Sequence, residues 1–66
     1  MKNRIRAERA ELRMTQQALA DATGVSRQTI NAIETGRFVP STILALKIAQ
    51  VFQKSVEQVF QLDPGD

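Results

Sequence analysis

The sequence predicts a compact all-α fold built from five short helices. Residues that favour helix starts recur along the chain, and glycines follow two of the segments that they introduce. Apolar residues between these signals recur every three or four positions, which is the spacing of one helix face. With 66 residues, the chain is long enough for one small domain. The start signals are Thr15, Ser26, Ser41 and Ser55.

The first two helices are expected over about residues 2–13 and 16–23. Ile5 and Leu12 are the large apolar residues of the first segment, and they share one helical face. Thr15 can cap the second helix, whose alanine-rich sequence has high helix propensity. Gly24 follows, where a glycine in the left-handed conformation commonly ends a helix.

The third helix is expected to start after Ser26, to run to about Thr35 and to end at Gly36. Pro40 and Ser41 introduce a fourth helix, in which apolar residues again recur at helical spacing. Its apolar positions are Leu44, Ala45, Ile48, Val51 and Phe52.

The carboxyl-terminal part predicts one more short helix. Residues 55–58, Ser-Val-Glu-Gln, have the pattern of a capping box, in which the first and last side chains each bond the other's backbone N–H. The segment Phe60–Leu62 can continue this helix or form a short strand, and the sequence leaves both open. Residues 63–66 are expected to be a frayed tail, so that the folded domain covers residues 1–62.

The composition argues against several classes of function. The chain has no cysteine and no histidine, which removes the commonest metal ligands and the commonest general base. We therefore expect no catalytic residue, metal site, cofactor or small-molecule substrate, and the chain is not expected to be an enzyme. No apolar run reaches membrane-spanning length and the charged start does not resemble a signal peptide, so the expected location is the cytoplasm, at the nucleoid.

Charge is distributed unevenly along the chain. Residues 1–13 carry five basic and two acidic side chains, whereas residues 55–66 carry three acidic side chains and no basic one. A basic end suits a polyanion partner, with the acidic end turned away from it. An ordinary solvated surface can have the same charges, so the charge distribution alone does not show that the partner is a polyanion.

Residues 16–35 have the layout of a helix-turn-helix. Only Gly24 and Val25 separate the two short helices, and Ala20 supplies the small side chain that closely crossing helices need. An αα-hairpin without a role in DNA binding is the alternative, and the combined spacing favours DNA binding. The apolar residues that such a pair would bury are Leu19, Val25, Ile30 and Ile33.

Two charged residues interrupt apolar helix faces. Arg9 lies between Ile5 and Leu12 on the inward face of the first helix. Glu34 lies four positions after Ile30 on the inward face of the third. A lone buried charge is unfavourable, whereas two opposite charges can satisfy each other. We predict a structural ion pair between Arg9 and Glu34.

Several segments together carry a family resemblance. Residues 15–20 read TQQALA and residues 24–37 read GVSRQTINAIETGR, followed by Pro40-Ser41 and by ALKIA at 45–49. This pattern resembles the xenobiotic-response-element (XRE) family, which is similar to the Cro and CI repressors of phages. The resemblance extends to about Leu62 and is closest to the minimal subgroup, which has a single domain.

The resemblance implies a lambda-repressor-like fold of five helices, with the third helix in the DNA major groove. It also implies that the Arg9–Glu34 pair is a shared structural feature. Some minimal members pair a terminal strand and dimerise through their carboxyl-terminal parts, and a short terminal β-pairing is expected here too. Ile43 departs from the family pattern, which usually has a polar residue at this position.

The expected base contacts are the outward-facing polar residues Arg27, Gln28 and Asn31 of the third helix. Arginine can bond two acceptors of guanine, and glutamine or asparagine can bond adenine in two places. Periodicity alone allows these residues simply to face water. The resemblance favours Gln28 and Asn31 as base contacts and then Arg27, which can bind phosphate instead.

Phosphate contacts are expected at the start of the second helix, where free N–H groups favour anions, and around the third helix. Ser26 can cap the third helix or touch a phosphate, and Thr29 can contact a phosphate or a thymine methyl group. The expected phosphate contacts are Thr15, Gln16, Ser26, Thr29, Thr35 and Arg37.

A symmetric homodimer would double these contacts and bind a pseudo-palindrome with half-sites ~34 Å apart. Alternatively, the residues expected at its interface close the core of one chain. Phe38 is also expected in a core or an interface, because no basic aromatic cluster suggests base stacking. The expected interface residues are Ile43, Val59, Phe60 and Leu62.

The predicted function is a transcriptional regulator, with repression favoured, that binds double-stranded DNA sequence-specifically. The alternative is an antitoxin-like or other protein-interaction module with the same fold. RNA binding is disfavoured because the aromatic residues that stack on unpaired bases are missing.

Overall fold

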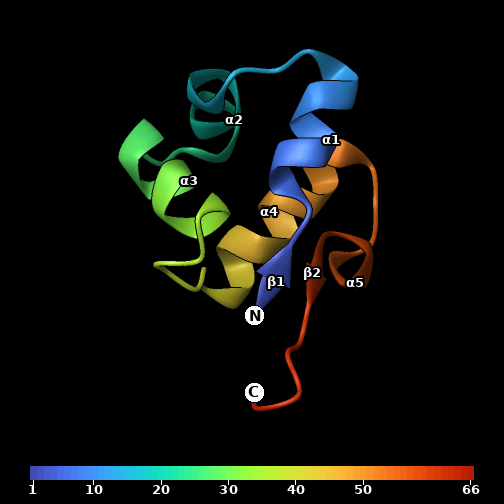
Figure 1. The fold of residues 1–66 in the computed structure, drawn as a ribbon. Helices are drawn as coiled ribbons and strands as arrows, with labels where there is room; N and C mark the ends of the chain where they lie inside the picture. The colour runs from blue at the N-terminus through green and yellow to red at the C-terminus, as the bar shows by residue number, and fades with distance from the viewer.

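Five α-helices form the body of the molecule, and a two-stranded antiparallel sheet joins its two ends. The computed structural model describes all residues from Met1 to Asp66. In Figure 1, α4 lies between the α2–α3 pair on one side and α1, α5 and the strands on the other. The elements are β1 (Lys2–Asn3), α1 (Ile5–Leu12), α2 (Gln16–Thr23), α3 (Arg27–Glu34), α4 (Thr42–Phe52), α5 (Val56–Val59) and β2 (Phe60–Gln61).

The predicted helix starts are confirmed for α2 to α5. At each start, the hydroxyl of the cap residue accepts a hydrogen bond from the backbone N–H three positions on, which satisfies one of the free donors at the helix end. The capping box is also present, since the Gln58 side chain accepts a hydrogen bond from the Ser55 N–H at 2.8 Å. The cap residues are Thr15, Ser26, Ser41 and Ser55.

The expected start of the first helix at Lys2 is wrong. Lys2 and Asn3 are extended and pair with Gln61 and Phe60, respectively, which resolves the ambiguity of the carboxyl-terminal segment in favour of a strand. The Asn3 Oδ1 atom then accepts a hydrogen bond from the N–H of Ile5, the first residue of α1, at 3.1 Å. The start of this helix is therefore set by a pairing with the far end of the chain.

The core contains most of the apolar residues that helical spacing predicts, but Leu12, expected on the inward face of the first helix, is 53% exposed. Leu19, Ala20 and Ile30 have no exposed surface and Ile33 is 1% exposed, so the contact between α2 and α3 is fully closed. Thr23 is also buried, and its hydroxyl donates to the Leu19 carbonyl at 2.8 Å. Most of the rest of the core comes from Ile5, Leu44, Ile48, Ala49, Phe52, Val59 and Phe60.

A buried carboxylate went unpredicted. Glu8 is 3% exposed and lies one turn after Ile5 on the inward face of α1. Its Oε2 atom lies 3.1 Å from Lys54 Nζ and 3.7 Å from Arg4 Nε. The pairing between Glu8 and Lys54 ties α1 to the loop between α4 and α5.

The last four residues, which the sequence predicts to fray, lie against the amino terminus. The Met1 ammonium is 2.9 Å from Asp63 Oδ2 and 3.1 Å from Asp66 Oδ2. These contacts extend the junction that β1 and β2 begin.

None of the helices has the length and hydropathy required to cross a lipid bilayer.

Candidate nucleic-acid interface

The turn between α2 and α3 has the tight geometry of a helix-turn-helix. Gly24 has a φ of 77°, in the left-handed region that glycine adopts without strain. The N–H groups of Gly24 and Val25 both donate to the Ala20 carbonyl, at 2.8 and 3.1 Å. This turn leads directly into Ser26, the cap of α3, and thereby fixes how the start of α3 is presented.

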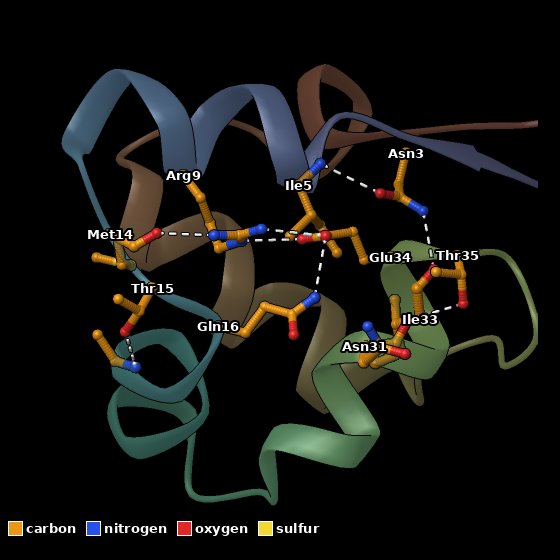
Figure 2. A network of polar contacts seen from close by, with 11 residues as sticks. Asn3, Ile5, Arg9, Met14, Thr15, Gln16, Asn31, Ile33, Glu34 and Thr35 are labelled. Atoms are coloured by element: carbon orange, nitrogen blue, oxygen red, sulfur yellow. Dashed lines mark hydrogen bonds and ion pairs between the residues drawn. The ribbon is translucent and has the colours of Figure 1, made fainter.

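Arg9 and Glu34 join α1 to α3 through a bidentate ion pair (Figure 2). Arg9 Nε donates to Glu34 Oε1 at 2.9 Å, and Arg9 Nη2 donates to Glu34 Oε2 at 3.1 Å. Arg9 Nη1 also donates to the Met14 carbonyl at 2.8 Å, so the guanidinium holds the loop before α2 as well. Their side chains are only 16% and 9% exposed.

Gln16 completes this network from the first turn of α2. Its Nε2 atom donates to Glu34 Oε2 at 3.1 Å, so the side chain reaches toward the Arg9–Glu34 pair (Figure 2). Burial raises the pKa of the Glu34 carboxyl, but the hydrogen bonds from Arg9 and Gln16 and the Arg9 charge outweigh it, and the pKa lies below its usual value. Glu34 is therefore a stable carboxylate that positions α1, α2 and α3.

The start of α2 presents unused backbone donors. The Thr15 hydroxyl accepts a hydrogen bond from the Ala18 N–H at 3.0 Å, and the N–H groups of Gln16 and Gln17 have no acceptor within the helix because they open it. The positive end of the helix dipole adds to these donors. This end of α2 can bind an anion through backbone N–H groups, with the Thr15 hydroxyl beside them.

Arg27 and Gln28 are exposed at the start of α3, and their side chains form no hydrogen bond or ion pair with the rest of the chain. The Ser26 hydroxyl accepts from the Thr29 N–H at 3.1 Å and lies 3.0 Å from the Thr29 hydroxyl. Ser26 is thus the cap of α3. The two free side chains beside it can reach a ligand without breaking an existing contact.

At the other end of α3, the chain reverses at Gly36, which has a φ of 81°. The Arg37 N–H donates to the Ala32 carbonyl at 2.8 Å and the Gly36 N–H to the Ile33 carbonyl at 3.0 Å, which is a Schellman ending. The reversal brings the Arg37 side chain back onto α3, where Nη2 lies 3.1 Å from Asn31 Oδ1.

Phe38 does not lie in the core of the chain, which leaves an interface as its expected place. It is 51% exposed, because the reversal after α3 carries it over the surface of the helix. There it lines a shallow hollow together with Gln28, Thr29, Ala32 and Arg37. The hollow is therefore lined by α3 and by the loop that follows it.

The expected dimer residues fall into two groups. Val59 has no exposed surface and Phe60 is 8% exposed, so these two belong to the core of one chain and are corrected as interface residues. Ile43 and Leu62 are 69% and 76% exposed. Leu62 borders an apolar groove that lies over α4, α5 and β2, away from α3.

No group of three or more potential metal ligands occurs in the structure.

Comparison with known proteins places this geometry in a family. A helix-turn-helix family model matches residues 5–59, which extend from the start of α1 to the end of α5. The chain belongs to the XRE family of helix-turn-helix transcriptional regulators. Membership in this family agrees with the resemblance in the sequence and with the five-helix fold.

Relatives of this XRE-family protein match it over almost their whole length. The uncharacterized HTH-type transcriptional regulator YgzD of Bacillus subtilis is 46% identical over 63 residues, which cover 96% of each chain. An uncharacterized HTH-type transcriptional regulator of Methanocaldococcus jannaschii is 50% identical over 60 residues, or 91% of each chain. A crystal structure of the P22 c2 repressor in complex with a synthetic operator superposes with a TM-score of 0.79 at 33% identity, covering 82% of both chains.

Proposed function

We propose that this XRE-family protein represses transcription by binding double-stranded DNA sequence-specifically, with α3 in the major groove. The observation that carries the proposal is the pair of free side chains, Arg27 and Gln28, at the start of a helix whose position is fixed by the turn and by Glu34. The first residues of a recognition helix are those that contact base edges. The P22 c2 repressor, which has the same fold, was crystallised with operator DNA.

The side chains of α3 supply the chemistry for base contacts. Arg27 can donate twice to guanine, and Gln28 can donate to and accept from adenine, with about 1–3 kcal/mol of discrimination for each good pair. Asn31 is the third proposed base contact. Its carbonyl oxygen is already bonded to Arg37, which restricts what it can contact.

Phosphate contacts would anchor the protein on either side of these bases. Backbone N–H groups of Gln16 and Gln17 face outward from the start of α2, beside Thr15. Thr29, Thr35 and Ser26 have hydroxyl groups near the two ends of α3, and the guanidinium of Arg37 keeps unused donors. Such contacts fix orientation on the duplex and carry no sequence information by themselves.

The proposed active form is a homodimer whose interface includes Ile43 and Leu62. Leu62 projects beside the apolar groove that Val39, Leu46 and Val56 help to line. A projecting side chain next to a hollow suits a two-fold interface, in which the projection of each copy fills the hollow of the other. Two such copies would contact half-sites ~34 Å apart on the DNA of the nucleoid.

Binding to the DNA upstream of the protein's own gene, compared with unrelated DNA across a salt series, tests the proposal. We expect preference for the upstream DNA and two protected half-sites. Gln28→Ala should weaken specific binding by about 5- to 150-fold, the equivalent of the discrimination of one base contact. Gln50→Ala, an exposed glutamine on α4, is the matched control and should bind as the wild type does.

Equal, salt-sensitive binding to both DNAs would contradict the proposal, because attraction to phosphate alone depends on salt and not on sequence. The protein-interaction module would then become the better account. Its first candidate surface would be the apolar groove bordered by Leu62.

A further inference from the structure

Phe38 is the one phenylalanine that the core does not bury. Phe52 and Phe60 are 6% and 8% exposed, whereas Phe38 is 51% exposed. The Phe38 N–H donates to the Ala32 carbonyl at 3.1 Å, so the chain holds this residue against the carboxyl-terminal half of α3. The ending of α3 therefore places an exposed aromatic side chain beside the helix that we propose to bind DNA.

Apolar groups dominate the hollow that Phe38 lines. Ala32 contributes a methyl group and Phe38 a ring. Thr29 also lines the hollow, and its hydroxyl lies within hydrogen-bonding distance, 3.0 Å, of the cap hydroxyl of α3. Because this hydroxyl already has a partner, the methyl group is the part of Thr29 left for a ligand. Gln28 and Arg37 complete the lining, which includes a positive charge and no acidic residue.

The place of the hollow indicates that its occupant is a base edge of DNA. Gln28, a proposed base contact, lines the hollow, and the guanidinium of Arg37 keeps unused donors for a phosphate. In the major groove, the apolar group of a base edge is the C5 methyl group of thymine, which alanine, threonine methyl and phenylalanine groups contact. The hollow combines these three kinds of group. 5-Methylcytosine carries the same methyl group at the same ring position.

We propose that this hollow binds the C5 methyl group of a pyrimidine, and that Phe38 is thereby a specificity-determining residue outside α3. The inference rests on the proposed function and names a chemical feature of the bases that the site distinguishes. Arg27 and Gln28 supply hydrogen bonds to base edges, and the hollow adds a contact that depends on shape and hydrophobicity. Burial of one methyl-sized group corresponds to about a fourfold gain in affinity.

Replacement of single thymines by deoxyuridine tests the proposal, because it removes the C5 methyl group and preserves base pairing. Each thymine of one protected half-site in the upstream DNA is replaced in turn, and binding is measured by fluorescence anisotropy. For the wild type, we expect a position at which the replacement weakens binding about fourfold. At that position, Phe38→Ala should bind the thymine and deoxyuridine duplexes with nearly equal affinity.

Leu12→Ala is the matched control, because Leu12 is 53% exposed but lines none of the hollows of the surface. It should keep the full preference for thymine. Phe38→Leu retains an apolar side chain and should keep part of that preference. Phe38 is exposed, so we expect its variants to stay folded, which thermal melting by circular dichroism verifies.

A further pair of duplexes distinguishes the two sources of the methyl group. At the position that depends on Phe38, the thymine–adenine pair is replaced by cytosine–guanine or by 5-methylcytosine–guanine. Stronger binding of the methylated duplex by the wild type, but not by Phe38→Ala, would show that the hollow accepts either pyrimidine. Equal binding of these two duplexes would assign the hollow to thymine.

Two outcomes would overturn the inference while leaving the proposed function intact. These are wild-type binding that no deoxyuridine weakens, and a preference for thymine that a folded Phe38→Ala variant keeps at every position. If the wild type does not prefer its upstream DNA, the proposed function itself fails and the inference fails with it.

Discussion

Replacement of Arg9 with alanine should remove much of the stability of the fold. The variant loses both hydrogen bonds to Glu34 and the one to the Met14 carbonyl, and it leaves a carboxylate that is 9% exposed with Gln16 as its one remaining partner. Breaking a buried ion pair on one side costs about 3–5 kcal/mol. A chain of this size has roughly 3–10 kcal/mol of stability in all, from typical per-residue values. The expected loss is therefore a large share of the total.

Thermal and urea unfolding at neutral pH, followed by circular dichroism, measure this loss. At about 4–8 °C per kcal/mol for a small domain, the midpoint should fall by about 12–40 °C. Glu11→Ala is the matched control, since Glu11 is exposed on the same helix without an ion pair and should change stability by no more than about 0.5 kcal/mol. Replacing both partners by apolar residues, in Arg9→Met with Glu34→Leu, should recover part of the loss because no charge is then left unpaired. Unchanged melting of Arg9→Ala would refute the reasoning.

Three further predictions concern the carboxylate, the helix ending and the dimer. Because folding lowers the pKa of Glu34, the carboxylate contributes its full stabilisation above its ordinary pKa of about 4.5 and loses it as the pH falls through the folded pKa. The difference in unfolding free energy between wild type and Glu34→Gln, measured by urea unfolding, should therefore shrink in acid. A difference that stays constant with pH would contradict this. Gly36→Ala should cost about 1–2 kcal/mol in the same assay, from backbone conformation alone, because no atom lies near the added Cβ. Gly65→Ala should be neutral, and equal losses of stability in the two variants would contradict this. Leu62→Asp should shift a dimer to a monomer in sedimentation equilibrium, whereas Leu12→Asp, at another exposed leucine, should leave the dimer intact. A wild type that is monomeric at micromolar concentration would contradict the proposed dimer.

Local signals in the sequence predicted most of the helices. The caps at Thr15 and Ser26 and the stops at Gly24 and Gly36 depend on residues within a few positions, so their chemistry is visible in the sequence. Arg9 and Glu34 could be paired across 25 positions because each is a charge on an otherwise apolar face. Apolar periodicity and caps were sufficient wherever the structure depends on near neighbours.

Contacts that depend on side-chain direction or on distant pairing could not be predicted in this way. The helical pattern of the sequence includes Lys2, and its strand partner, Gln61, lies at the other end of the chain, where no local signal points to it. The sequence cannot distinguish a core from an interface position for Val59, because an apolar residue in a short helix can face either; the structure buries it in the core. The glycine at position 36 signalled the end of α3, but the return of Arg37 onto Asn31 depends on side-chain conformation, which the sequence does not specify.

Mapping of backbone amide chemical shifts with a DNA duplex that carries one protected half-site of the upstream DNA tests the central claim most directly. If α3 enters the major groove, the largest changes should fall at residues 15–18 and 26–37, which hold the start of α2 and the exposed face of α3. Residues 55–59, around α5, should change little at the same DNA concentration. Largest changes along the apolar groove beside Leu62, with residues 26–31 unaffected, would contradict the claim and indicate a surface for another kind of partner.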